Sequence, residues 1–205
     1  SVTALERPIR VGVVGCGVQG RAHLRALRAF APGHATVAGL CDLDAERLEQ
    51  AGADWPEARR TRDFAGLFAH GALDLALLCT MPNTHARIAV AALQAGAHVV
   101  VEKPFAMNAT EAETIVDAAE LADRCVHLGT NMRYMPHAQY LRYVFASGRI
   151  GEALQCRVFG GHRDPPWWAP HYNRATSSGG VLASTLIHPL DMALYVCGYP
   201  RPVTV

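Results

Sequence analysis

The chain has 205 residues, of which 50% are hydrophobic and 18% are charged, and its formal net charge is +1. A soluble globular protein of this length can bury one large core or two small ones. The weak net charge gives no electrostatic case for nucleic acid or an anionic membrane as a partner, and no apolar run approaches the roughly 20 residues that span a bilayer.

Short apolar strands and helices alternate over the first 130 residues. Strands are expected at residues 9–14, 35–41, 73–79, 98–101 and 125–129, and helices at residues 21–30, 45–51, 63–70, 84–95 and 110–122. Thr110 and Glu113 have the spacing of a capping box at the start of the last of these helices. Strands without polar–apolar alternation are typical of a parallel sheet that is covered on both faces. The pattern predicts a doubly wound α/β fold for residues 1–130.

The rhythm changes after this point. We expect, in order, a helix, a strand, a loop rich in Pro, Trp and His, and a last helix at residues 136–147, 154–160, 161–180 and 189–196. Residues 202–205 have the pattern of a further strand. Residues 131–205 are therefore expected to form the start of a second α/β domain.

A glycine-rich loop, Gly15-Cys16-Gly17-Val18-Gln19-Gly20, follows the first strand and opens the first helix. In this context Gly15 permits a tight turn, Gly17 lets the backbone approach a pyrophosphate, and Gly20 lets helix and strand pack closely. The helix N-terminus at Val18 and Gln19 adds N–H groups and a favourable dipole for phosphate. The loop predicts a dinucleotide-binding Rossmann domain.

Asp42 ends the second strand, where a carboxylate can hydrogen-bond the adenosine ribose hydroxyls and repel a 2′-phosphate. NAD is therefore the expected cofactor. Arg47 lies nearby in the sequence and leaves NADP possible. Asp42 is also a candidate N-cap for the helix that follows.

The six cysteines stand singly, several of them in apolar runs, and form no Cys-x-x-Cys pair. They predict reduced thiols and a cytoplasmic location. The histidines have no spacing that indicates a metal site.

Lys103 is the single lysine of a chain with 18 arginines. A lysine can shift its pKa and pass a proton, whereas an arginine stays charged. Lys103 also follows the strand at 98–101, and the carboxyl ends of parallel strands line the ligand crevice of such a sheet. Its position therefore favours a functional role over a chance survival.

Further motifs follow in a fixed order: Thr80-Met81-Pro82-Asn83-Thr84-His85, Glu102-Lys103-Pro104, Gly129-Thr130-Asn131-Met132-Arg133-Tyr134, Gly179-Gly180-Val181-Leu182 and His188-Pro189-Leu190-Asp191. With the glycine loop, this set resembles the Gfo/Idh/MocA family, the glucose–fructose oxidoreductase and inositol dehydrogenase type, from about residue 9 to the end. The resemblance implies a Rossmann domain followed by an α/β domain with a large, mostly antiparallel sheet. It also implies oxidation or reduction of a hydroxyl or carbonyl on sugars, cyclitols and related compounds, with NAD or NADP.

The resemblance also assigns roles to single residues. It makes cofactor-binding residues of Thr80, Pro82, Asn83 and His85, the last three near the nicotinamide end. Glu102 would face the nicotinamide ribose. Lys103 would bind the cofactor and reach the reacting oxygen, and His188 would be the acid/base. The peptide bond between Lys103 and Pro104 is a candidate cis bond.

His188 precedes Pro189, and proline is favoured at the first helical position. We therefore expect His188 at a helix N-terminus, where the dipole keeps the imidazole neutral. Asp191, one turn on, either orients the ring or caps the helix.

The match has two departures. Ser184 and Leu186 stand where the family has Asp and Gly, and the family's second domain continues past the end of this chain, so the chain is a fragment, a natural short form or one completed by a partner or a second copy. The expected substrate-binding residues are Asn131, Arg133, Tyr134, Trp167, Ser184 and Asp191. Trp167 and its aromatic neighbours suit a sugar ring, or they pack on a sheet.

The leading function is a nicotinamide-dependent oxidoreductase that transfers a hydride to or from a CH–OH carbon of a sugar, cyclitol or related polyol. One alternative is a dinucleotide-binding module or subunit without catalysis of its own. Another is an NAD-dependent glycoside hydrolase. The expected partner is a small polyol or sugar, with no nucleic acid, membrane or metal.

Overall fold

The computed structural model describes residues 7–70, 72–161, 163 and 173–204. The chain divides into two compact units, residues 1–128 and residues 129–205.

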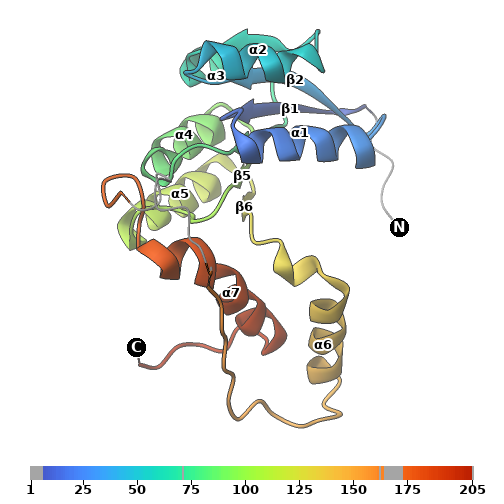
Figure 1. Cartoon of the computed structure of the whole chain (residues 1–205), viewed down its shortest axis with the longest axis vertical. Coiled ribbons are helices and arrows are strands. Elements are labelled where there is room, and N and C mark those ends of the chain that lie inside the picture. The colour runs from blue at the N-terminus through green and yellow to red at the C-terminus, as the bar shows by residue number, and fades with distance from the viewer. Residues whose placement is uncertain (1–6, 71, 162, 164–172, 205) are drawn as a thin grey trace. The chain divides into compact units, whose positions relative to one another are not determined.

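The first unit is built on a six-stranded parallel sheet with the order β3-β2-β1-β4-β5-β6 (Figure 1). Its strands are β1 (Ile9–Val14), β2 (Ala35–Cys41), β3 (Arg59–Thr61), β4 (Leu75–Leu78), β5 (His98–Val101) and β6 (Val126–Leu128). The doubly wound α/β fold is confirmed. The order reverses between β1 and β4, and ligands bind at such a switch point, beyond the carboxyl ends of the strands.

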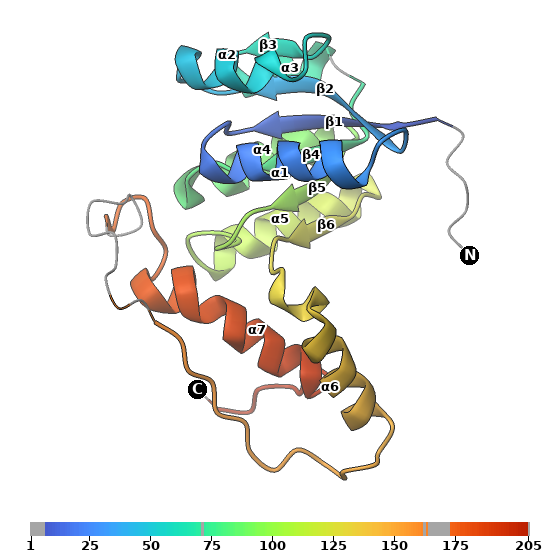
Figure 2. The same ribbon diagram turned by 45° about the vertical axis from the view of Figure 1, so that its right-hand side comes forward.

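Helices connect the strands and cover both faces of the sheet (Figure 2). They are α1 (Val18–Phe30), α2 (Ala45–Ala53), α3 (Phe64–His70), α4 (Pro82–Gln94) and α5 (Ala109–Ala122). One face buries Leu24 of α1 and Leu48 of α2 in a common cluster with β1 and β2. The other buries Leu67, Ile88 and Ile115 of α3, α4 and α5 with β4 and β5. The strands therefore lie between two apolar layers, as their unbroken hydrophobicity predicted.

Two helices start earlier than expected, and a third has a different cap. The helices α1 and α4 begin at Val18 and Pro82, so the ends of the glycine loop and of the Thr80–His85 motif are themselves first turns. The α5 cap is Asn108, whose side chain accepts from the Glu111 backbone N–H at 2.9 Å, and the expected pairing of Thr110 with Glu113 is wrong.

The second unit contains the short 3₁₀ helix η1 (Met132–Tyr134), the helix α6 (Pro136–Ala146), a π turn η3 (Leu182–Leu186) and the helix α7 (Ile187–Val196). The helices α6 and α7 pack against each other. The π turn ends three residues before Pro189, which lacks a backbone N–H and crowds the carbonyl four residues earlier, that of Thr185 within the turn.

The strands expected at 154–160 and 202–205 are not formed in the described residues. A strand needs a neighbour that satisfies its backbone N–H and C=O groups. All strands of the described residues belong to the first unit's sheet. Every helix of the described residues is too short or too polar to cross a membrane.

Candidate functional site

The glycine loop is a tight turn between β1 and α1. Gly15 has φ 93°, its N–H donates to the Cys41 carbonyl at 2.8 Å, and a Cβ there would lie 2.6 Å from the Cys79 carbonyl oxygen. A Cβ on Gly20 would overlap the Gly15 carbonyl oxygen. A Cβ on Gly17 would meet only Arg47 Nη1, at 3.9 Å. The loop is thus closed on the sheet side and open over Gly17, at the N-terminus of α1.

Val18 and Gln19 are exposed at the first turn of α1. The first N–H groups of a helix have no partner within it, so this turn offers donors to an anion. This geometry fits a pyrophosphate, because the loop and the first turn of α1 supply hydrogen-bond donors from the backbone alone.

Asp42 lies beside this loop and holds it. Its Oδ2 accepts from the Cys16 N–H at 2.6 Å, and its Oδ1 accepts from the Asp44 N–H at 2.9 Å. The N-cap of α2 is Asp44, whose carboxylate accepts from the backbone N–H groups of Glu46 and Arg47. The alternative of Asp42 as that cap is therefore wrong.

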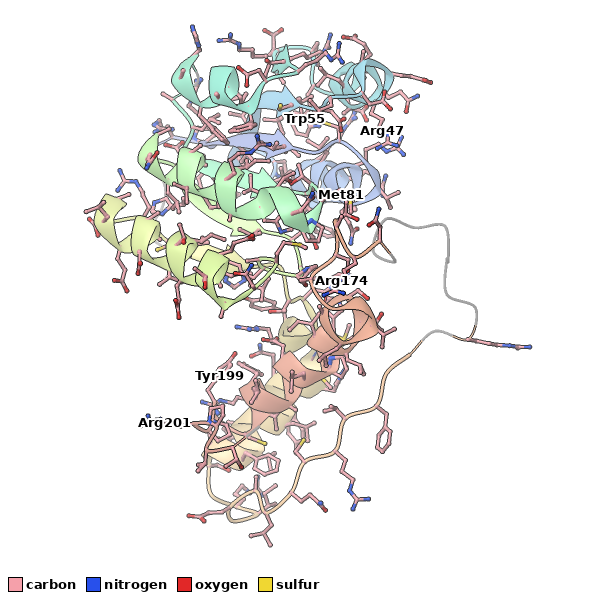
Figure 3. The ribbon with its side chains drawn as sticks, turned by 90° about the vertical axis from the view of Figure 1, so that its left-hand side faces the viewer. Arg47, Trp55, Met81, Arg174, Tyr199 and Arg201 are labelled. Carbon is pink, nitrogen blue, oxygen red and sulfur yellow. The ribbon has the colours of Figure 1, made fainter. Side chains whose placement is uncertain are left out.

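Arg47 lies beside Gly17 and pairs with Asp44, with 3.2 Å between Nε and Oδ2. Arg47 belongs to α2, the helix after β2. Met81 belongs to the turn after β4, and Figure 3 labels both residues. Among the described residues, this guanidinium is the cation within 4 Å of the Gly17 Cβ position, where an adenosine ribose is expected nearby.

The turn after β4 carries the Thr80–His85 motif. Thr84 Oγ1 lies 2.8 Å from Thr80 Oγ1 and 2.7 Å from the Met81 carbonyl. Pro82 is buried at the start of α4, and Asn83 is exposed. These contacts order the turn at the carboxyl end of the sheet.

His85 is fully buried, and its ring lies between two backbone carbonyls. Nδ1 is 2.9 Å from the Pro104 oxygen and Nε2 is 3.1 Å from the Thr80 oxygen. Burial lowers the pKa of His85 despite these acceptors, which keeps the ring neutral. The ring therefore connects the turn after β4 to the segment after β5, and a direct contact with the cofactor stays a prediction.

Glu102 and Lys103 follow β5, and the bond between Lys103 and Pro104 is cis, as expected. Burial alone would raise the pKa of Glu102, but the hydrogen bond and charge of His23, with the amide and charge of Lys103, hold it below its ordinary value. Burial lowers the pKa of Lys103, and the charge of Glu102 only partly opposes this. An acid and a base with shifted pKa values thus adjoin each other at the carboxyl end of β5.

His23 is a residue of this site that the sequence pattern did not reveal. It lies on α1, and its Nε2 is 2.8 Å from Glu102 Oε1. Its position in the sequence could have indicated this role, because His23 lies three residues after Gly20, the glycine that brings α1 close to the strand ends. One helical turn beyond that contact, a side chain can still reach a neighbouring strand end.

The thiols near the loop do not act as nucleophiles at neutral pH. Burial raises the pKa of Cys16 to about 12 and that of Cys41 to about 11, and it also raises that of Cys79. A protonated, buried thiol is a small hydrophobic group. The six cysteines are free.

In the second unit, Arg133 and Asp191 form a nearly buried ion pair. Arg133 Nε donates to Asp191 Oδ2 at 2.9 Å, and Arg133 Nη2 contacts Asp191 Oδ1. The guanidinium also lies 5.7 Å from the ring centre of Tyr199. Both charges are expected substrate residues, and the structure brings them together with each other.

The sequence predicted His188 at a helix N-terminus, because it precedes Pro189. This prediction is wrong. The helix α7 continues directly from the π turn Leu182–Leu186, so the dipole argument for a neutral ring does not apply. Asp191 lies inside the helix and does not cap it. Its carboxylate is held by Arg133, and a role in orienting the His188 ring stays a prediction.

The remaining expected substrate residues are spread over the second unit. Ser184 lies in the π turn, with its Oγ 3.5 Å from Thr185 Oγ1. Asn131 accepts the Tyr134 N–H through its carbonyl in η1, and the Tyr134 side chain is exposed. Trp167 lies outside the described residues. That Lys103 and His188 act on one substrate stays a prediction.

Comparison with known proteins places both units. Residues 9–130 match the model of an oxidoreductase family with an NAD-binding Rossmann fold, and residues 138–205 match a GFO/IDH/MocA C-terminal domain. Inositol 2-dehydrogenase 2 of Saccharopolyspora erythraea is 31% identical over 191 residues, which cover 93% of this chain and 54% of that protein. D-apiose dehydrogenase of Paraburkholderia graminis is 30% identical over 199 residues, which cover 97% of this chain and 52% of that protein.

Solved structures agree. A probable dehydrogenase from Thermotoga maritima superposes with a TM-score of 0.82 at 27% identity, over 93% of this chain and 55% of that chain. The WlbA dehydrogenase from Bordetella pertussis, in complex with NADH and UDP-GlcNAcA, gives a TM-score of 0.68 at 29% identity, over 73% of this chain and 43% of that chain. The chain spans about half the length of the curated relatives it matches. From its family-model matches and its fold, the chain belongs to the Gfo/Idh/MocA oxidoreductase family.

Proposed function

We propose that this chain binds NAD and contributes to an oxidoreductase that acts on a CH–OH carbon of a sugar, cyclitol or related polyol. The observation that carries the proposal is the partly buried Lys103. It lies next to Glu102, beyond the carboxyl ends of the strands, where the glycine loop also lies. A lysine in that position points to a chemical task, because this chain otherwise uses arginine where a lysine could stand.

The residues present fit NAD. The open face over Gly17 and the first turn of α1 would hold the pyrophosphate, and the Asp42 carboxylate would accept from the adenosine ribose hydroxyls. The same carboxylate disfavours a 2′-phosphate, and Arg47 beside Gly17 is the group that would moderate that preference. Glu102 and the Thr80–His85 turn would face the nicotinamide end.

When bound, NAD accepts or supplies the hydride that the reaction needs. Lys103 would lie at the substrate oxygen, where an ammonium stabilises negative charge that develops there. Its pKa, lowered by burial, brings the proton nearer to exchange at physiological pH than in an exposed lysine. His188, in the second unit, would move the hydroxyl proton, and Ser184 offers a hydroxyl where the family has a carboxylate.

The substrate class is supported by the relatives. Inositol 2-dehydrogenases and D-apiose dehydrogenase are named for a cyclitol and a sugar, and the WlbA structure holds a sugar nucleotide. All are polyhydroxylated compounds, which suits a site that offers a cation and hydroxyl-binding groups.

The decisive experiment is Lys103→Met. We expect the dissociation constant for NADH, measured by fluorescence titration, to stay near the wild-type value, and turnover with a panel of polyols to fall by at least about 100-fold. Arg25→Met, which removes a cation from the exposed face of α1, is the matched control and should change neither. Undiminished turnover in Lys103→Met would refute the assigned role.

The wild-type chain separates the remaining functions in the same assays. NADH binding without turnover of any polyol would favour a cofactor-binding module or subunit, a reading that the Ser184 departure motivates. Release of a sugar from a glycoside without net NADH formation would favour the NAD-dependent hydrolase.

A further inference from the structure

The Glu102 carboxylate is held from two sides. Its Oε1 lies 2.8 Å from Nε2 of His23 on α1, and its Oε2 accepts from the Lys103 backbone N–H at 3.3 Å. The Glu102 side chain is 13% exposed and that of His23 is 34% exposed. The two partners are thus an imidazole from another element and the amide of the next residue.

Two further titratable groups of the described residues interact with Glu102, and both are neutral. Burial lowers the pKa of His85 on α4 and raises that of Cys79 after β4, so neither carries a charge at neutral pH. Arginine side chains are not among the groups that shift the pKa of Glu102, whereas His23 and Lys103 are. Among the residues that the structure describes, His23 and the Lys103 ammonium are therefore the two groups that compete for this carboxylate.

We propose that His23 is a positioning residue that holds the Glu102 carboxylate against α1 and so limits its attraction to the Lys103 ammonium. A carboxylate that His23 no longer holds can turn toward the side chain of the next residue. A closer opposite charge stabilises the protonated amine and raises its pKa. His23 thereby acts on Lys103 through Glu102, without touching it.

The meaning for catalysis rests on the proposed function. A lysine drawn into a tight ion pair presents its ammonium less to a substrate oxygen, and it gives up its proton only at higher pH. The pairing itself does not depend on the function and can be measured on the chain alone.

Lys103 makes that measurement direct, because it is the only lysine in the sequence. Reductive methylation with ¹³C-formaldehyde labels this side chain and the α-amino group and nothing else. The Lys103 resonance is assigned by its loss in Lys103→Arg, and its chemical shift against pH gives its pKa by NMR.

Two variants of His23 differ in reach by one carbon. The amide nitrogen of His23→Gln can occupy the position of Nε2 and keep the donor, whereas that of His23→Asn is too short. We expect the Lys103 pKa to rise by about 1 in His23→Asn and to stay near the wild-type value in His23→Gln. Both are polar substitutions at a partly exposed helical position, and the circular dichroism spectrum confirms that each variant is folded.

Glu102→Gln tests the route of the effect. It removes the charge that supports protonated Lys103, so the Lys103 pKa should fall below the wild-type value. His23→Asn added to Glu102→Gln should then change nothing further. An unchanged Lys103 pKa in His23→Asn, an equal rise in His23→Gln, or an equal rise in the Glu102→Gln background would each overturn the proposal.

This titration needs neither cofactor nor turnover. A negative result would remove His23 from the site and leave the oxidoreductase proposal standing. A chain without turnover that still shows the expected pKa changes would count against the oxidoreductase proposal and leave the role of His23 standing.

Discussion

The two units hold their functional candidates in different ways. In the first unit, Asp42 accepts the Cys16 amide and the His85 ring meets two backbone carbonyls, so side chains from separate strand ends are fixed by the main chain. In the second unit, Arg133 and Asp191 are fixed mainly by each other. A site built on the main chain is sensitive to changes in backbone shape, and one built on a side-chain pair is sensitive to the loss of either partner.

The largest expected effect comes from changing the backbone at the glycine loop. In Gly15→Ala, the new Cβ would meet the Cys79 carbonyl at 2.6 Å at a residue whose φ is 93°, and neither backbone segment can move easily. We expect a loss of about 3 kcal/mol or more in the free energy of unfolding and a loss of NADH binding. Urea denaturation and NADH fluorescence titration measure the two effects.

Gly33→Ala is the matched control. Gly33 also has a positive φ, 78°, but no atom lies within 4 Å of the Cβ position. It should cost only the conformational strain, about 1 kcal/mol, and leave NADH binding unchanged. Equal effects of the two variants would contradict the importance of the contact with Cys79.

The next effect concerns the side-chain pair of the second unit. Arg133→Ala would leave the Asp191 carboxylate, which is 8% exposed, without its cation, and we expect about 3 kcal/mol of destabilisation. Amide hydrogen exchange in α7 should accelerate, while NADH affinity should not change. Arg133→Met combined with Asp191→Leu should recover much of the stability, because no buried charge remains. A double variant as unstable as the single one would exclude this explanation.

The smallest effect is expected from an exposed pair at the opposite end of the sheet. The two guanidinium hydrogen bonds of Arg7, together with the Arg10 amide, outweigh burial and lower the pKa of Asp74 from 3.8 to about 2. The stability from this lowered pKa is present above pH 3.8 and is lost as the pH falls through about 2. Arg7→Ala should therefore destabilise the chain less at about pH 2 than at about pH 6, as urea denaturation would show, and by less than Arg133→Ala because Arg7 is exposed. An equal loss at both pH values would show that the pair acts by packing alone.

The strands at 9–14, 35–41 and 98–101 were predictable from sequence because buried parallel strands are continuous apolar runs. The strand β3 was missed because its residues, Arg-Arg-Thr, lie at the sheet edge with little burial. The prediction of a strand at 154–160 was wrong although the run is apolar, because an apolar run forms a strand only beside a partner strand.

The candidate site divides in the same way. The glycine loop, Asp42 and Lys103 could be found because each occupies a defined place at a strand end, and Glu102 was found through the family resemblance. The pairing of His23 with Glu102 joins residues 79 positions apart in the sequence, and that of Arg133 with Asp191 joins residues 58 apart. No local pattern carries such pairings, because they depend on how helices pack.

The hydrogen bond from the Cys16 amide to Asp42 constrains how cofactor preference can change. The carboxylate that we propose discriminates against a 2′-phosphate also holds the backbone of the loop that we propose binds the pyrophosphate. Replacing Asp42 with a small neutral residue to admit NADP would release the Cys16 amide and loosen that loop. A switch of cofactor in this chain would therefore need a second acceptor for that one N–H, and selectivity and affinity cannot be redesigned separately.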